Sequence, residues 1–231
     1  KFKTSYKNCN AKYRGVTAVP IEYDKKDLKL HPYFIGLWLG DGFKREKLIC
    51  FAENEIEIKR WLIGYAKSDP ERFSYNIKLA SNQGSFGDMN VYRFRLIDKT
   101  MLYKNNYWSK TFRNNKHIPI EYLQSSIDQR LELLAGLLDS DGNYSKKMHR
   151  YTFCNSDFNL IKQVEELCWS LGYRTTINSR RVSIKNNANY NLRIYGEIGR
   201  IPCKIKRKKA PVRVYKNSKG SNKNVINIEK Y

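Results

Sequence analysis

Two aspartates stand at the ends of two similar short runs. Asp41 is the eighth residue of FIGLWLGDG (34–42) and Asp141 the eighth of LAGLLDSDG (134–142). Each run is apolar and carries small residues four positions apart, which lie on one face of a helix and let two helix backbones approach closely. The repeat therefore predicts two helices packed against each other. The expected contact face holds Gly36, Gly40, Gly136 and Ser140.

Packed in this way, the two helices would end side by side, and we expect the following glycine to cap each end in the left-handed conformation. Asp-Gly after an apolar run is also an ordinary helix end, but two matched copies favour a shared site. Two carboxylates at the negative ends of neighbouring helix dipoles repel each other unless a cation lies between them. Oxygen ligands favour Mg²⁺, with Mn²⁺ as a substitute, at Asp41 and Asp141. Asp139 faces elsewhere on its helix and corresponds to Leu39, so we assign it no equivalent role.

The elements that must position these aspartates also occur twice. After Gly42, an expected strand at 47–51 precedes a helix at 54–67, and after Gly142 a strand at 150–154 precedes a helix at 157–173 with Ser156 as its N-cap. Further strands are expected at 73–80 and 90–97 in the first half, and at 190–196 and either 173–177 or 181–185 in the second. The pattern predicts an α+β fold, a pseudo-two-fold pair of αββαββα-type halves with the motif helices at the seam.

The charge of the chain points to a polyanionic partner. Forty-four Lys and Arg against 22 Asp and Glu give a formal net charge of +22, while 41% hydrophobic residues exclude a disordered tail. Nucleic acid is favoured over a membrane surface, because no apolar run is long enough to span a bilayer and the chain does not open like a signal peptide. We expect a soluble, intracellular protein whose five scattered cysteines are reduced.

Residues 134–142 resemble the signature of the LAGLIDADG homing endonucleases and differ from it only at Leu138 and Ser140. Residues 34–42 are a looser copy, and the resemblance covers about residues 30 to 210. With two motifs, the chain is similar to the two-motif form of the family and most resembles an endonuclease domain encoded within an intein. The resemblance implies a pseudo-symmetric monomer that cleaves both strands of a long, specific double-stranded DNA site, with catalytic metal bound by the last aspartate of each motif.

The same resemblance implies a basic residue near the scissile phosphate in each half. In the first half, NKHIP (115–119, with its Asn at 115) places Lys116 at the matching position. In the second half the counterpart is expected in KIKRKKA (204–210), where Lys209 is the first choice and Lys208 the second. Physically, a lysine beside the scissile group stabilises the charge that develops on the phosphate.

A strand that reads DNA shows polar side chains on one face and core residues on the other. Three segments have this alternation together with a basic bias, and they predict a DNA-binding β-saddle. The expected DNA contacts are Arg93, Arg95, Arg181, Lys185, Asn191, Arg193 and Tyr195, joined by Lys204, Lys206 and Lys208 from the basic run that follows.

These features divide the chain into a basic segment at 1–30, a first half at 31–118, a second half at 119–210 and a basic segment at 211–231, which we expect to be the remnant of a splicing domain. An intact intein is disfavoured, because the chain begins at Lys1 and ends at Tyr231 without His-Asn. Two alternatives keep the fold without DNA cleavage: a DNA-binding regulator and an RNA maturase. Retention of both Asp41 and Asp141 argues against the regulator.

Overall fold

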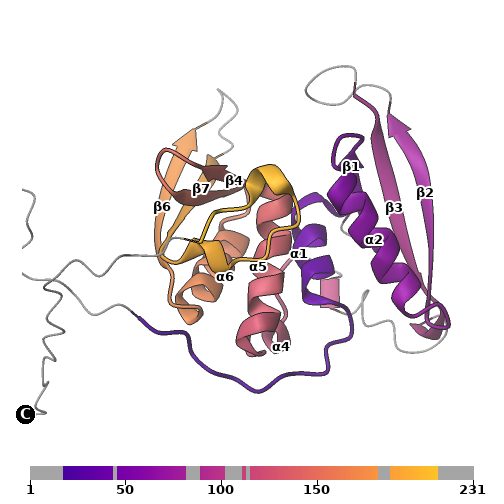
Figure 1. Ribbon diagram of the computed structural model, residues 1–231, viewed down its shortest axis with the longest axis horizontal. Helices are drawn as coiled ribbons and strands as arrows, with labels where there is room; N and C mark the ends of the chain where they lie inside the picture. Colours follow the sequence, from indigo (N-terminus) through magenta and orange to yellow (C-terminus); the bar gives the residue numbers. More distant parts are fainter. Residues whose placement is uncertain are drawn as a thin grey trace, which may run out of the picture.

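The computed structural model describes residues 18–43, 46–81, 89–101, 111–112, 115–181 and 188–212. Two helices stand at its centre, and an antiparallel sheet lies on either side of them (Figure 1). The first half contributes α1 (Pro32–Asp41), β1 (Leu48–Ala52), α2 (Ile56–Ser68), β2 (Phe73–Ser81), β3 (Val91–Asp98) and the 3₁₀ turn η1 (Lys99–Met101). Its sheet has the order β1-β3-β2.

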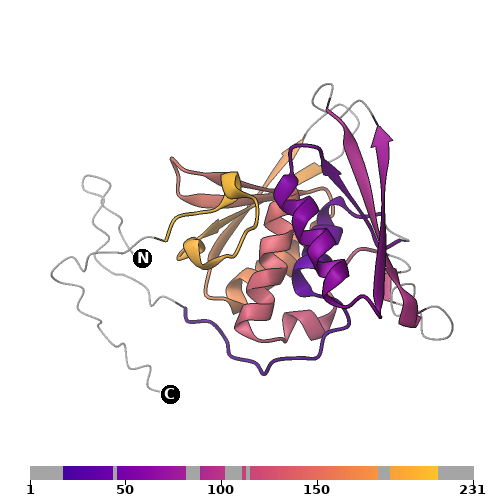
Figure 2. The ribbon, with the colours of Figure 1, turned by 45° about the vertical axis from the view of Figure 1, so that its right-hand side comes forward.

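The second half repeats this order with one more strand. It contains α4 (Ile120–Leu123), α5 (Ile127–Asp141), β4 (Gly142–Ser145), β5 (Arg150–Asn155), α6 (Phe158–Ser170), β6 (Arg174–Arg181) and β7 (Ala188–Tyr195), followed by the 3₁₀ turns η2 (Ile198–Arg200) and η3 (Lys206–Lys208). Its sheet has the order β4-β5-β7-β6. Figure 1 shows α1 and α5 side by side between the two sheets, and in the rotated view of Figure 2 the helix α2 lies in front of α1. The predicted α+β, pseudo-two-fold architecture is confirmed.

Three local expectations need correction or qualification. The N-cap of α6 is Asp157 and not Ser156, because the Asp157 carboxylate accepts hydrogen bonds from the backbone N–H groups of Asn159 and Leu160. Of the two candidate strands in the second half, 173–177 overlaps β6, whereas 182–187 lies outside the described residues. The strand that follows the second motif, β4, is represented in the first half by a single bridge between Gly42 and Ile49.

The predicted helix seam is confirmed at the glycines of the two motifs. A Cβ added to Gly36 would lie 2.9 Å from the Gly136 Cα, 2.8 Å from the Leu137 nitrogen and closer still to the Leu133 carbonyl oxygen. One added to Gly136 would lie 2.8 Å from the Leu37 nitrogen and would also overlap backbone of α1. The helices therefore touch backbone to backbone, which only glycine at these positions permits.

The expected left-handed caps are wrong. Gly42 and Gly142 follow the two helices with φ of −88° and −97°, which is extended backbone that any residue adopts. Glycine is required there for space: a Cβ on Gly42 would lie 2.5 Å from Trp38 Cγ, and one on Gly142 would lie 2.6 Å from Leu138 Cα. After each motif helix, the backbone turns sharply across the helix end; it passes into the strand β4 after α5 and into the bridge between Gly42 and Ile49 after α1.

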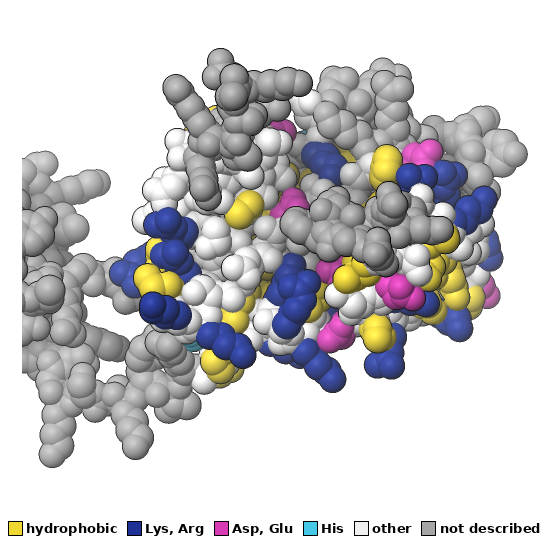
Figure 3. Space-filling model, turned by 90° about the horizontal axis from the view of Figure 1, so that it is seen from above, with side chains coloured by type: hydrophobic (Ala, Val, Ile, Leu, Met, Phe, Trp, Pro, Cys, Tyr) yellow, Lys and Arg dark blue, Asp and Glu magenta, His cyan; other side chains and the backbone are white. Residues whose placement is uncertain are grey.

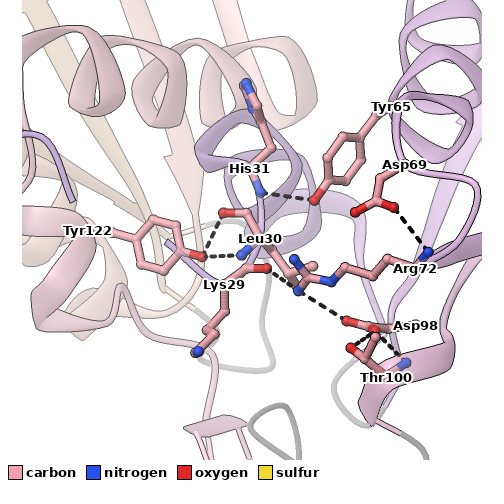
Figure 4. Close-up of polar contacts among 9 residues, drawn as sticks. All are labelled: Lys29, Leu30, His31, Tyr65, Asp69, Arg72, Asp98, Thr100 and Tyr122. Atoms are coloured by element: carbon pink, nitrogen blue, oxygen red, sulfur yellow. Dashed lines mark hydrogen bonds and ion pairs between the residues drawn. The ribbon is translucent and has the colours of Figure 1, made fainter. Parts of the chain in front are cut away.

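The beginning of α1 is held from both halves. Tyr122 of α4 donates its hydroxyl to the Leu30 carbonyl at 2.9 Å and accepts the Leu30 N–H at 3.2 Å, while Tyr65 of α2 accepts the His31 N–H at 3.1 Å (Figure 4). Arg72 donates to the Lys29 carbonyl at 2.6 Å. These contacts fix where the first motif helix starts, and with it where its C-terminal end lies.

The segment before α1, residues 18–31, forms a strap that runs under the helices toward the second half (Figure 1). Its main anchor is Arg130 of α5, which is fully buried and donates to the carbonyls of Ile21, Ser125 and Ser170 and to the Ser170 hydroxyl. Gln129 exchanges two hydrogen bonds with the backbone of Lys26, at 3.0 and 2.7 Å. The strap thus precedes the first half in sequence, but its earlier part, at Ile21 and Lys26, is bonded to the second.

Candidate active site at the ends of the motif helices

Asp41 and Asp141 lie at the C-terminal ends of α1 and α5, where the sequence predicts them to meet. A Cβ added to Gly40 would lie 2.5 Å from the Ser140 Cβ and 3.3 Å from Asp141 Oδ2, so the end of α1 touches the end of α5. Asn155, the last residue of β5, donates its side-chain amide to Asp141 Oδ2 at 3.2 Å. The second carboxylate is therefore oriented by its own sheet.

The pKa of each carboxyl is raised above its usual value. Burial is the largest cause for Asp41 and raises its pKa to about 7, together with the charges of Asp141 and Glu55 and against those of Lys208 and Lys116. Burial also raises the pKa of Asp141, opposed by the Asn155 hydrogen bond. The Asp41 side chain is exposed to solvent, so water and salt screen much of this effect. A cation between the two carboxyls would favour their ionised form and lower both pKa values.

Two lysines support these helix ends in the same way. Lys116 donates its Nζ to the carbonyl oxygens of Leu39 and Gly40, at 3.0 and 2.8 Å. Lys208 donates its Nζ to the carbonyls of Leu138, Asp139 and Ser140, at 3.1, 2.6 and 3.0 Å. Each ammonium therefore binds carbonyls of the last helical turn just before the terminal aspartate; of these, the Leu138 carbonyl also accepts the Gly142 N–H. Both positive charges lie behind the carboxylate pair.

The second-half counterpart of Lys116 in this geometry is Lys208 and not Lys209, the first choice from the sequence. Lys208 is the last residue of the turn η3 and is only 5% exposed, whereas Lys209 follows the turn and is exposed to solvent. Tyr151 explains the difference, since its hydroxyl donates to the Lys208 carbonyl at 2.6 Å and accepts the Ala210 N–H at 3.0 Å. With the backbone fixed on both sides, the Lys208 side chain points into the protein.

The donor set fits a hard divalent cation that completes its shell elsewhere. Asp41 and Asp141 offer only carboxylate oxygens, which Mg²⁺ and Mn²⁺ prefer. Among the residues that the structure describes, no group of three or more His, Cys, Asp or Glu could hold a metal ion. Two carboxylates alone match Mg²⁺ sites in which waters and substrate phosphates supply the remaining ligands.

The predicted DNA-contacting strands have the expected alternation. In β3, Arg93 and Arg95 are exposed while Phe94 and Leu96 are buried. In β7, Asn191, Arg193 and Tyr195 are partly exposed and alternate with the buried Leu192 and Ile194. Viewed onto the helix ends, Lys and Arg side chains lie on both flanks of a smaller number of acidic ones (Figure 3). Both sheets thus present polar faces.

Several of these side chains already have partners. Arg95 forms a 2.6 Å ion pair with Glu46, and Arg93 lies over the Phe43 ring at 5.4 Å. Asn191 accepts a hydrogen bond from the Cys154 thiol at 2.8 Å.

The remaining predicted contacts fall into three groups. Lys204 forms an ion pair with Glu132 at 2.8 Å, so its side chain is committed to α5, whereas Lys206 is exposed. Lys208 is buried at the helix end. Arg181 ends β6, and Lys185 lies outside the described residues.

Sequence reasoning missed two polar residues near the site. Asn155 follows its strand at the point where β5 passes the helix end, and only the pairing of β5 with β4 shows that it reaches Asp141. Asp139 is buried and accepts hydrogen bonds from the Tyr33 hydroxyl at 2.7 Å and the Lys204 N–H at 2.5 Å. Burial raises the pKa of Asp139, and these hydrogen bonds oppose the rise. An acidic residue where the other motif has leucine was the available signal.

No helix in the described part of the chain is long and apolar enough to cross a bilayer.

Among curated proteins, the chain is similar to the replicative DNA helicase DnaB of Mycobacterium intracellulare, with 30% identity over 174 residues. The match covers 75% of this chain, which spans about a quarter of the helicase, 24% of its length.

Among solved structures, a mesophilic variant of the homing endonuclease I-DmoI aligns with a TM-score of 0.48 and 18% identity, over 71% of this chain and 87% of that one. I-DmoI in complex with DNA and Ca aligns with a TM-score of 0.47 and 18% identity, over 71% and 82%. The N-terminal LAGLIDADG domain of WhiA aligns with a TM-score of 0.43 and 12% identity, over 74% and 78%.

A family model for the LAGLIDADG-like domain matches residues 128–200. The matched segment runs from the first turn of α5 through β7, so it includes Asp141, the strand that carries Asn155 and the whole second sheet. The chain therefore carries a LAGLIDADG-like domain.

Proposed function

We propose that the protein is a site-specific DNA endonuclease that cuts both strands of a duplex by metal-dependent hydrolysis of phosphodiester bonds. One observation carries the proposal: two carboxylates lie at adjoining helix ends, each end backed by a buried or half-buried lysine bonded to its last carbonyls. We divide the site between two halves of the chain: the first half, at 31–118, supplies Asp41 and Lys116, and the second half, at 119–210, supplies Asp141 and Lys208. The protein acts as a monomer, since one chain holds both units.

In this proposal each residue has a separate task. Asp41 and Asp141 hold Mg²⁺ or Mn²⁺ at the seam, and Asn155 keeps the Asp141 carboxylate turned toward it. Bound there, the cation supplies Lewis-acid stabilisation of the charge on a scissile phosphate. Lys116 and Lys208 place positive charge behind the same point, which favours an approaching phosphate and offsets the negative ends of the two helices. A duplex has two strands to cut, and the repeat offers each one a lysine and a helix end.

The two sheets are proposed to hold the duplex by their polar faces. Arg93 and Arg193 stand on inner strands of their sheets, Arg93 opposite Cys50 and Lys78 and Arg193 opposite Thr152 and Thr176. Guanidinium groups can donate two hydrogen bonds to a guanine edge or bind a phosphate. With a net charge of +22, the affinity for DNA should fall steeply with salt, with a slope of roughly −0.9 in log K per phosphate contact.

The similarity to part of a helicase supports an endonuclease that is carried within another protein, as the resemblance to intein endonucleases implies. The chain contains no Gly-Lys pair and hence no G-x-x-x-x-G-K-[ST] loop for nucleotide phosphates. The segment shared with the helicase therefore does not include such a phosphate-binding loop. An inserted endonuclease is consistent with a match that covers most of this chain and 24% of that protein.

The test is cleavage of a randomised duplex library by the full chain with Mg²⁺, followed by sequencing of the cut ends. Asp41→Asn and Asp141→Asn should each abolish cleavage of both strands while DNA binding remains, because the amide keeps the shape but lacks the charge that holds the cation. Asp128→Asn, an exposed change on the same helix as Asp141, is the matched control and should cut normally.

Other results would favour a different function. If wild-type protein bound a specific duplex but cut nothing with Mg²⁺ or Mn²⁺, the DNA-binding regulator would replace this proposal. Tighter binding to structured RNA than to any duplex DNA would favour the RNA maturase. Cleavage at the wild-type rate by either aspartate variant would refute the two-carboxylate site.

A further inference from the structure

The two lysines at the helix ends are held by different means. Lys208 is 5% exposed and ends the turn η3, where Tyr151 holds its backbone, whereas Lys116 is half-buried. Lys116 also lies over the ring of Trp38, with its Nζ 5.3 Å from the ring centre. The pseudo-symmetry of the fold is thus broken behind the two carboxylates.

Asp139 anchors the segment that leads to Lys208. Its Oδ2 accepts the backbone N–H of Lys204 at 2.5 Å and the hydroxyl of Tyr33, from α1, at 2.7 Å. The Lys204 side chain adds a second attachment to α5 through Glu132, at 2.8 Å. These bonds fix the point at which the chain leaves the second sheet and begins to pass along α5.

From that point the chain reaches Lys208 in four residues. The Lys208 N–H donates to the Ile205 carbonyl at 3.0 Å in the turn η3, and Tyr151 binds the Lys208 carbonyl from the other side. A turn of this kind has little freedom once both ends are attached. The bond from Asp139 to Lys204 therefore fixes the start of the turn that carries Lys208 at its end.

A carboxylate at position 139 is not needed to build the helix. The equivalent residue of α1 is Leu39, which is fully buried and packs in the core. Burying a carboxylate costs free energy that leucine does not, even when hydrogen bonds offset part of it. The second motif bears this cost at the place where the segment that carries Lys208 is attached.

We propose that Asp139 is a positioning residue for Lys208, and that it acts on the cleavage of only one of the two DNA strands. The inference rests on the proposed endonuclease function. Asp139 does not face the carboxylate pair, so it need not contact the DNA or the cation. Its effect passes through the Lys204 backbone and the turn to the Lys208 ammonium.

The test compares two substitutions of the same residue. Asp139→Leu gives the second motif the residue that the first motif already has, and it removes the acceptor for Lys204. Asp139→Asn keeps an oxygen acceptor at the same place. Cleavage is followed on a target duplex with a different label on each strand, and Lys116→Met and Lys208→Met identify which strand depends on which lysine.

Asp139→Leu should reproduce the pattern of Lys208→Met. We expect cleavage of the Lys208-dependent strand to slow at least tenfold, that of the other strand to stay within about twofold, and nicked duplex to accumulate. Asp139→Asn should retain most of the wild-type rate on both strands. The second strand is an internal control, because a folding defect would slow both cuts together. Equal loss on both strands, or none on either, would overturn the proposal.

A second measurement does not depend on cleavage. Brief acetylation of the free protein with acetic anhydride, followed by mass spectrometry, reports how accessible each lysine is. Asp139→Leu should increase acetylation of Lys208 about tenfold or more, with Lys116 unchanged and Asp139→Asn near wild type. If wild-type protein cut no DNA, the endonuclease proposal would fail, and acetylation would still decide the positioning. Unchanged reactivity of Lys208 in Asp139→Leu would refute it.

Discussion

Gly136→Ala should destabilise the protein, although alanine is the better helix former. The added methyl would lie 2.8 Å from the Leu37 nitrogen and 3.0 Å from the Gly36 Cα, and nearer still to the Tyr33 carbonyl oxygen. All three are backbone atoms, so no side chain can rotate away and the two helices must move apart. Overpacking of this kind costs about 3 kcal/mol at the upper end of its usual range. Helix propensity returns about 1 kcal/mol, which leaves a net loss of about 2 kcal/mol.

The chain offers a matched control in Gly64, which lies in the middle of α2. A Cβ added there meets nothing within 4 Å. Gly64→Ala therefore gains the helix propensity alone, about 1 kcal/mol. In a protein of this size each kcal/mol changes the melting temperature by about 2 to 4 °C. The two variants should thus move in opposite directions in a thermal melt followed by circular dichroism.

The comparison has a clear negative outcome. If Gly136→Ala melted at or above the wild-type temperature, the backbone contact between α1 and α5 would be wrong. Gly136→Leu, with a still larger side chain, should cost at least about 2 kcal/mol and pull the two aspartates apart. A Gly136→Leu variant that cut DNA normally would count against the seam as the element that positions the site.

Two further predictions concern stability. Because the pKa of Asp41 is raised to about 7 in the folded protein, the fold keeps a proton that the unfolded chain loses above about pH 4, so metal-free stability should fall as pH rises from about 4 to 7. Asp41→Asn should therefore melt above wild type at pH 8, and the difference should vanish near pH 4; a constant difference across that range would contradict the raised pKa. Arg130→Met leaves the carbonyls of Ile21 and Ser125 without the Arg130 donor and should cost at least about 2 kcal/mol, whereas Arg60→Met on the exposed face of α2 should cost little. The same Arg130 variant should be cut faster by trypsin within the strap at 18–31, and equal protease resistance would show that Arg130 is not its anchor.

The sequence predicted the parts of this fold that depend on periodicity and repetition. Two helices in contact at Gly36 and Gly136 followed from small residues at helical spacing in two aligned copies, and the alternation in β3 predicted which of its side chains are buried. These features depend on the spacing of residues within one short segment or within two matching segments, so they can be predicted from the sequence alone.

The errors concern contacts between distant segments. The choice of Lys209 over Lys208 could not be corrected from the run KIKRKKA, because only the hydroxyl of Tyr151, 57 positions away, sets which lysine turns inward. Asp139 was given no role equivalent to the terminal aspartates, but its partners Tyr33 and Lys204 could not be predicted, because they lie 106 and 65 positions distant. The prediction of left-handed glycine caps was wrong for another reason. Glycine is selected both where φ is positive and where there is no room for a Cβ, and the sequence does not distinguish the two cases.

The strap at 18–31 places a constraint on the order of folding. Its N–H at Ile21 donates to the carbonyl of Ser170, at the end of α6, so a segment made early must wait for one made much later. At about 5 to 20 residues per second, a ribosome needs roughly 7 to 30 seconds to add the chain between them. The first sheet can form in that interval, but the strap and the anchor at Arg130 cannot. The earliest described residues are therefore among the last to be fixed, and a chimera that exchanges one half must take the strap together with the second.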